Sequence, residues 1–230
     1  MLKRLSFLLS LVLILALGVT GVTASGHGAS VYVIHGIPGA NGFPVDVSVD
    51  GACALPNFTF GTRAGPLNLP AGTYTIAVHA PADGNCGGSA AIGPVDLTFA
   101  DGDNKTIIAH LTEAGVPTAS VFDNDFSPTG RGSARIIAHH TAAAPSVDVV
   151  VARNYFGGGP RIAVPDFTNG DQIAAEVRPG DWQVTLELGG TPVYGPTPLT
   201  LNPFTAYSVY AVGVFPDSFQ YLVYANSGLK

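Results

Sequence analysis

The sequence predicts an all-β chain with two tandem β-sandwich domains, immunoglobulin-like or transthyretin-like, behind a cleaved signal peptide. Three observations support this prediction. Apolar and polar residues alternate with a period of two, turn sequences recur at short intervals, and a set of sequence landmarks occurs twice in the same order. We expect the signal peptide at 1–24, the first domain at 25–128 and the second domain at 129–230.

The start of the chain has the order of a secretory signal peptide. Lys3 and Arg4 precede an uncharged apolar run from Leu5 to Val19, and small residues follow up to Ala24, the expected cleavage position. The alternative is an uncleaved membrane anchor, for which the apolar run is slightly short. We therefore expect a secreted or cell-surface protein with no membrane span in the mature chain.

The alternation with a period of two is clearest in VDVSVD, residues 45–50, and TYTIAVH, residues 73–79. It indicates strands with one face on a core and the other face in water. The turn signals PAG, ADG and RPGD separate such strands, and 29 Gly and 18 Pro residues disfavour helix. Each domain should therefore hold about six to eight short strands.

The second half of the chain repeats the first. His35 followed by PVDVSV aligns with His139 followed by SVDVVV. Four further pairs keep the same order: 69–78 with 177–186, 92–99 with 194–201, 106–109 with 208–211, and 121–124 with 223–226. This order indicates a duplicated domain, and DFSPTGRGS, residues 125–133, is the expected linker between the copies.

Composition restricts the class of protein. Only 11% of the residues are charged and the net charge is −6, so the basic surface that a nucleic-acid partner requires is absent. With 47% hydrophobic residues the chain has enough apolar surface for folded cores.

Cys53 and Cys86 are the only cysteines. In an exported protein such a pair is expected to form one disulfide bond. The alternative is two free thiols acting in redox chemistry or metal binding, although they form no CxxC motif.

The segments VYVIHGIP, PVDVSVDG, FTFGT and LNLPAGTYTIAV together resemble the secreted and cell-wall bacterial family catalogued as a domain of unknown function, DUF4397. The resemblance covers the mature chain as two copies, and it implies an extracellular, β-rich and non-catalytic protein. The copies differ in loop length, because eight residues lead from His139 to Val147 whereas ten lead from His35 to Val45.

Each of these histidines precedes an aspartate on the next predicted strand, which gives the pairs His35 with Asp46 and His139 with Asp148. A hydrogen bond within a pair could orient the imidazole as a general base. The same bond could instead pin the turn between two strands. We favour structural turn pins and expect no catalytic residue, because no nucleophile elbow of the type G-x-S-x-G is present.

Calcium is the cofactor for which the sequence offers ligands. Asp123, Asn124 and Asp125 place hard oxygen atoms beside the expected linker, where an ion would stiffen the junction. Because such residues are also common in turns for backbone reasons, our primary expectation is that the protein has no cofactor.

The sequence therefore predicts a non-catalytic binding or structural module at the cell surface or in the extracellular matrix. Recognition would use the loops HGIPGANGFP and RNYFGGGP, and the partner would be a cell-envelope or extracellular polymer or protein, or further copies of the chain. Two alternatives stay open: a filament or surface-layer subunit that assembles through strand edges, and a His-dependent or metal-dependent hydrolase.

Overall fold

The computed structural model describes residues 28–39, 43–153 and 160–230, so the expected signal peptide at 1–24 lies outside the described residues. Eight strands form the first sandwich, called sandwich 1: β1 (Ala29–His35), β2 (Val45–Val49), β3 (Ala52–Phe58), β4 (Arg63–Leu69), β5 (Gly72–His79), β6 (Ala90–Phe99), β7 (Asn104–Leu111) and β8 (Pro117–Asp123). Eight more form sandwich 2: β9 (Ala134–His140), β10 (Val147–Arg153), β11 (Arg161–Phe167), β12 (Gln172–Val177), β13 (Gly180–Leu188), β14 (Thr191–Leu201), β15 (Thr205–Val212) and β16 (Gln220–Ser227).

The two sandwiches have the same wiring. Sandwich 1 contains the sheets β4-β1-β7-β8 and β3-β2-β5-β6, and sandwich 2 repeats them as β12-β9-β15-β16 and β11-β10-β13-β14. In both, the first strand runs parallel to the seventh. The prediction of two β-sandwiches is confirmed. Of the two wirings left open, this one is transthyretin-like, because immunoglobulin constant domains pair their strands as ABED and CFG.

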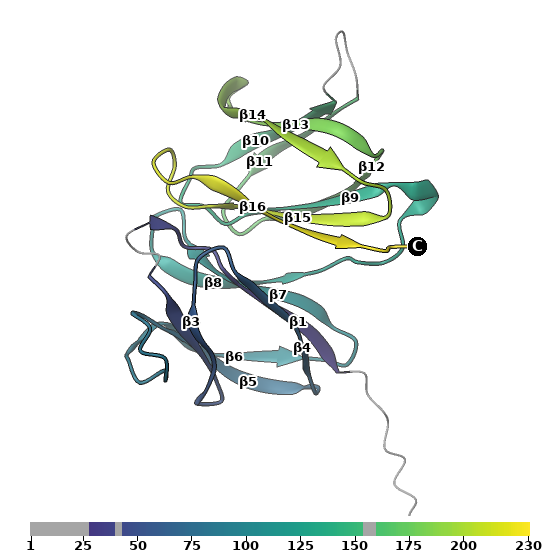
Figure 1. Ribbon diagram of the computed structural model, residues 1–230. Helices are drawn as coiled ribbons and strands as arrows, with labels where there is room; N and C mark the ends of the chain where they lie inside the picture. Colours follow the sequence, from purple (N-terminus) through teal and green to yellow (C-terminus); the bar gives the residue numbers. More distant parts are fainter. Residues whose placement is uncertain (1–27, 40–42, 154–159) are drawn as a thin grey trace, which may run out of the picture.

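The four sheets stack as four layers (Figure 1), with β4-β1-β7-β8 facing β12-β9-β15-β16 across the junction between the sandwiches. Along β1 and β7 the side chains point alternately into the core of sandwich 1 and into this junction. The junction contains Ile34 and Ile108 of sandwich 1 and Tyr210 and Val212 of sandwich 2, all fully buried. The alternation read from the sequence lies on β2 and β5 of an outer sheet, whereas the two inner sheets are covered by protein on both faces.

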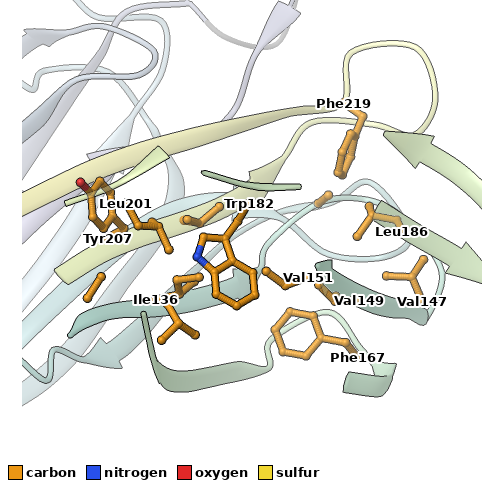
Figure 2. Close-up of a cluster of buried hydrophobic side chains, with 14 of the residues drawn as sticks. Ile136, Val147, Val149, Val151, Phe167, Trp182, Leu186, Leu201, Tyr207 and Phe219 are labelled. Carbon is orange, nitrogen blue, oxygen red and sulfur yellow. The ribbon is translucent and has the colours of Figure 1, made fainter. Parts of the chain in front are cut away.

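Each sandwich also has its own core between its two sheets. In sandwich 2, Trp182 lies at the centre (Figure 2), with its indole N–H donating to the carbonyl of Arg178 at 2.9 Å. Phe167 and Leu186 pack in the same cluster. Sandwich 1 has smaller side chains in its core, chiefly Val, Ile and Ala, with Phe58 and Phe99 as its buried aromatic residues. The same wiring is thus filled in two different ways.

The repeated Gly-Pro landmark marks a close approach between strands. Gly195 of β14 has a φ of +93°, and a Cβ atom there would lie 2.5 Å from the carbonyl oxygen of Val184 on β13. Gly93 of β6 has a φ of +83°, and its Cβ would lie 2.7 Å from the oxygen of Ile76. In both copies the register of the strand pair shifts at this point. Only glycine fits such a position.

We predict that Gly195→Ala destabilises the protein by about 2 to 4 kcal/mol, because the methyl group meets backbone and the positive φ is strained. Gly190→Ala is the matched control. Its φ is +79° but its Cβ would meet nothing within 4 Å, so it should cost only about 1 kcal/mol. Urea unfolding measures both values, and equal losses would contradict the role of the close contact.

Candidate functional site

His35 lies at the end of β1 and is 1% exposed. The backbone N–H of Ile37 donates to its Nδ1 at 3.3 Å, so Nε2 carries the proton and donates to the carbonyl of Phe43 at 3.0 Å. Burial lowers the pKa of His35, and the bond to Phe43 opposes this effect only in part. The imidazole is therefore a neutral side chain that fixes the loop between β1 and β2.

The structural counterpart of His35 is His140, which corrects the sequence alignment with His139. His35 pairs with Ala109 on β7, and His140 pairs with Ala211 on β15. The carbonyl of His35 accepts the N–H of Gly61, as the carbonyl of His140 accepts that of Gly170. The His140 Nε2–H donates to the carbonyl of Pro145 at 3.2 Å, so both histidines bond to the loop that follows their strand.

We predicted hydrogen bonds between His35 and Asp46 and between His139 and Asp148. In the structure these aspartates accept other donors. Asp46 accepts the N–H of Asn57 at 2.7 Å, and Asp148 accepts the N–H of Asp166 at 3.0 Å. These donors have φ angles of +51° and +52°. The two aspartates point away from the core in which His35 lies, because alternate residues of a strand face opposite sides of the sheet. Each aspartate thereby holds, on the neighbouring strand, a residue with left-handed backbone conformation.

Asp46 has a second role that Asp148 lacks. Its carboxylate also accepts the N–H groups of Asp83, Gly84 and Cys86, at 2.9, 2.8 and 3.2 Å. Burial by itself would raise the pKa of Asp46, but the backbone N–H donors outweigh it and hold the pKa well below its usual range. The carboxylate therefore anchors residues 80–89, which we call the disulfide loop.

The disulfide between Cys53 and Cys86 joins this loop to β3, with the two Cα atoms 5.4 Å apart. The predicted pairing is confirmed, and the alternative of two free thiols is wrong. Asp46, Cys53 and Cys86 come close together, but a disulfide offers no thiolate to a metal ion. The loop is thus held to the outer sheet by one covalent bond and by a buried carboxylate.

Sequence reasoning missed a serine and histidine pair beneath the disulfide loop. The Ser48 hydroxyl donates to Nε2 of His79 at 2.9 Å, and the Nδ1–H of His79 donates to the carbonyl of Gly88 at 2.7 Å. The two residues lie on the neighbouring strands β2 and β5, and only the ladder between these strands brings them together. Ser48 is 6% exposed, so its hydroxyl is covered and contributes to holding the loop.

His139 faces the junction between the sandwiches. Its ring stacks on Tyr210 with centroids 4.0 Å apart, and Phe122 of sandwich 1 meets it edge-on at 4.7 Å. The Nδ1–H donates to the carbonyl of Val209 at 3.2 Å. Burial lowers the pKa of His139 to about 4, so the ring is neutral in the folded protein above that pH. It is a packing residue of the junction and not a turn pin.

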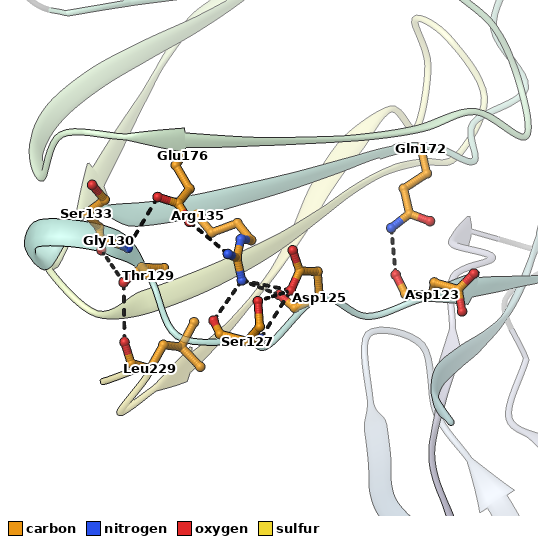
Figure 3. Close-up of polar contacts among 10 residues, drawn as sticks. All are labelled: Asp123, Asp125, Ser127, Thr129, Gly130, Ser133, Arg135, Gln172, Glu176 and Leu229. Carbon is orange, nitrogen blue, oxygen red and sulfur yellow. Dashed lines mark hydrogen bonds and ion pairs between the residues drawn. The ribbon is translucent and has the colours of Figure 1, made fainter. Parts of the chain in front are cut away.

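The candidate calcium ligands form bonds within the protein, and Figure 3 shows those of Asp125. Asp123 forms an ion pair with Lys105, and Asn124 accepts the hydroxyl of Thr106 at 3.0 Å. Asp125 accepts Arg135 at 3.0 Å, and the guanidinium also contacts Glu176 at 2.8 Å. The buried Arg135 thereby fixes the start of the linker. The expectation of no cofactor stays a prediction, and a calcium ion would have to displace these partners.

The fold and these contacts define the class: a disulfide-bonded protein of two transthyretin-like sandwiches, in which Asp46, Asp148, His35 and His140 hold loops and neighbouring strands. The chain belongs to the family described as domain of unknown function DUF4397, whose model matches residues 29–150. The match covers sandwich 1 and reaches through β9 into β10, and the second copy is recognised by its identical strand order.

Two solved structures are similar to this chain. A protein from Bacteroides ovatus ATCC 8483, proposed to act in cell adhesion, is 10% identical with a TM-score of 0.29, over 87% of this chain and 98% of that one. Another such protein, from Bacteroides eggerthii DSM 20697, is 12% identical with a TM-score of 0.22, over 87% and 96%. A comparison with curated proteins gives no match. In the described part of the chain no helix is long and apolar enough to cross a bilayer.

We predict that Asp46→Asn loosens the disulfide loop, because an amide directs an NH₂ group at several backbone donors. The amides of Asp83, Gly84 and Cys86 should exchange with deuterium at least about tenfold faster. Asp148→Asn, which loses a single such bond, is the control.

The pKa of Asp46 in the folded protein is depressed, so its carboxylate stabilises the fold at any pH above the ordinary aspartate pKa. This stabilisation is lost as the pH falls toward the folded pKa. Unchanged exchange would contradict the anchoring role.

We predict that the free energy of unfolding falls as the pH drops from about 6.5 to about 4, because the unfolded chain protonates His139 and the folded chain does not. His139 alone accounts for about 3 kcal/mol of this change. His35, His110 and His140 have lowered pKa values and act in the same direction. Urea unfolding of His139→Phe should show a shallower pH dependence by about one proton, and an unchanged slope would contradict the prediction.

Proposed function

We propose that this protein is a non-catalytic binding module exported to the cell surface or extracellular matrix, and that it recognises its partner with one end of sandwich 1. At this end Pro44, which directly precedes β2, lies beside the disulfide loop, and the N–H of Ala82 donates to its carbonyl at 2.9 Å. The proposed surface consists of Phe43, Pro44 and the disulfide loop. The other loop expected to bind, RNYFGGGP, falls largely on 154–159, outside the described residues.

The observation that carries the proposal is that Phe43 has a fixed backbone but is exposed to solvent. Its backbone carbonyl is fixed by His35, while the residue is 59% exposed, the largest value among the large hydrophobic residues that the structure describes. Aromatic side chains on preformed loops are typical anchors of binding surfaces, because little conformational entropy is lost when they bind. The Asp46 bonds and the disulfide restrict the neighbouring loop in the same way.

Four of the histidines support a binding role over hydrolysis. His35, His110, His139 and His140 are each 1 to 2% exposed, and burial lowers the pKa of each. An imidazole that is covered and bonded to backbone carbonyls has no access to a substrate proton. A disulfide is consistent with export, since such bonds persist in oxidising compartments.

The test compares two truncations of exposed apolar side chains. Phe43→Ala should weaken binding of the mature chain to cell-envelope fractions of the producing organism by about tenfold, as expected for an aromatic anchor. Leu188→Ala truncates a 39% exposed residue at the end of β13 in sandwich 2 and should leave binding unchanged. Equal binding of the Phe43 variant and the native protein, or no binding by the native protein, would overturn the proposal.

A further inference from the structure

Sandwich 1 encloses an apolar cavity of about 390 Å³ between its two sheets. The walls are aliphatic side chains from both sheets, among them Val31, Val47, Leu55, Ile76, Leu97 and Ile107. Protein interiors normally pack as densely as organic crystals, and voids larger than a water molecule are few. A space of this size therefore leaves many wall atoms without van der Waals partners, unless a ligand occupies it.

Sandwich 2 shows that the same wiring is compatible with a divided interior. Tyr194, Phe219 and Tyr221 form a cluster there, with ring centroids 4.7 to 5.6 Å apart. The central void of sandwich 2 is about 50 Å³ and is lined in part by Phe219 and Tyr221. A separate recess of about 290 Å³ is lined by residues of β13, β14, β15 and β16, among them Tyr194 and Tyr221. The large cavity is thus a property of the residues of sandwich 1 and not of the fold.

Strand register identifies the residues responsible. Ile92 pairs with Val78 on β5, as Tyr194 pairs with Leu186 on β13. Ala119 pairs with Ala109 on β7, as Tyr221 pairs with Ala211 on β15. Each tyrosine of sandwich 2 therefore stands where sandwich 1 has a smaller aliphatic side chain, and both small residues line the cavity.

The cavity reaches solvent where β6 and β8, an edge strand from each sheet, lie on the same side of sandwich 1. Val95 of β6 and Val121 of β8 line the cavity, yet they are 43% and 39% exposed to solvent. Exposed apolar residues that continue into an apolar interior are the expected feature of a ligand entrance.

The lining defines the chemistry of the ligand. Its polar side chains are His35 and Asn68, and the ring nitrogens of His35 are already bonded to Phe43 and Ile37. No charged side chain lines the space, so a buried ionic group would have no partner. The cavity extends from residues of β3 and β4 to residues of β6 and β8, a width of about 14 Å at the usual strand spacing. An elongated hydrocarbon group matches this slot.

We propose that sandwich 1 binds the hydrocarbon chain of a lipid-type molecule between its two sheets, with entry between β6 and β8. An engineered cavity of about 150 Å³ lined by aliphatic and aromatic side chains stays dry and binds benzene, so a larger apolar slot takes a longer apolar ligand. This site does not include the loop surface around Phe43. The proposal of hydrocarbon binding therefore does not depend on the proposed function of that surface.

The test is titration calorimetry of the mature chain with n-dodecanol. We expect one site per chain and a negative heat-capacity change, the signature of apolar burial. The double variant Ile92→Tyr/Ala119→Tyr introduces the tyrosines of sandwich 2 and should weaken binding by at least about tenfold. Its thermal midpoint should be equal or higher, because filling a cavity restores packing.

Two further variants serve as controls. Ala119→Tyr alone changes a partly exposed edge strand and should give a smaller loss of affinity. Tyr221→Ala makes the reverse change in sandwich 2 and should leave the affinity of the sandwich 1 site unchanged. Absence of dodecanol binding to the native chain overturns the proposal. Native affinity in a folded double variant does so as well.

Discussion

The packing of β4-β1-β7-β8 against β12-β9-β15-β16 is the constraint on which the rest of the molecule depends. It buries both faces of β1, β7, β9 and β15, so these strands are largely apolar, and their imidazole and phenol rings lie in the packed interior. This explains why His139 is stacked on Tyr210 and why the junction residues Ile34 and Ile108 are fully buried. The two sandwiches therefore behave as one body with four layers.

Such a body leaves its outer sheets and end loops as the accessible surfaces, and there the copies differ. Asp148 accepts one backbone N–H, whereas Asp46 accepts four and thereby holds the disulfide loop. Sandwich 2 uses its end loop differently: Ala143 packs with Ile37 and Leu111 of sandwich 1. The β1–β2 loop of sandwich 1 and the β9–β10 loop of sandwich 2 therefore both contribute to the junction, and the disulfide loop has no part in this cluster.

The sequence predicted the sandwich class, the duplication and the disulfide, because period-two alternation, repeated turns and cysteine number are local signals. It did not predict the junction, since alternation alone does not show whether the second face meets water or protein. A signal was present in ARIIAHH and TIIAHL, where apolar runs are nearly continuous, as in strands buried on both faces. The His35 alignment was wrong for the same reason: with two adjacent histidines, only strand pairing shows that His140 faces the core.

Duplication also explains how sandwich 1 can keep an open interior. A cavity costs stability through the contacts that its walls lose, and a single small domain tolerates little of this. Sandwich 2, with Trp182 and an aromatic cluster in its core, supplies a well-packed partner whose inner sheet supports β1 and β7 from behind. That support does not depend on the side chains between the two sheets of sandwich 1, so these side chains can be small. The weaker packing is then confined to the interior of sandwich 1 and does not reach the junction.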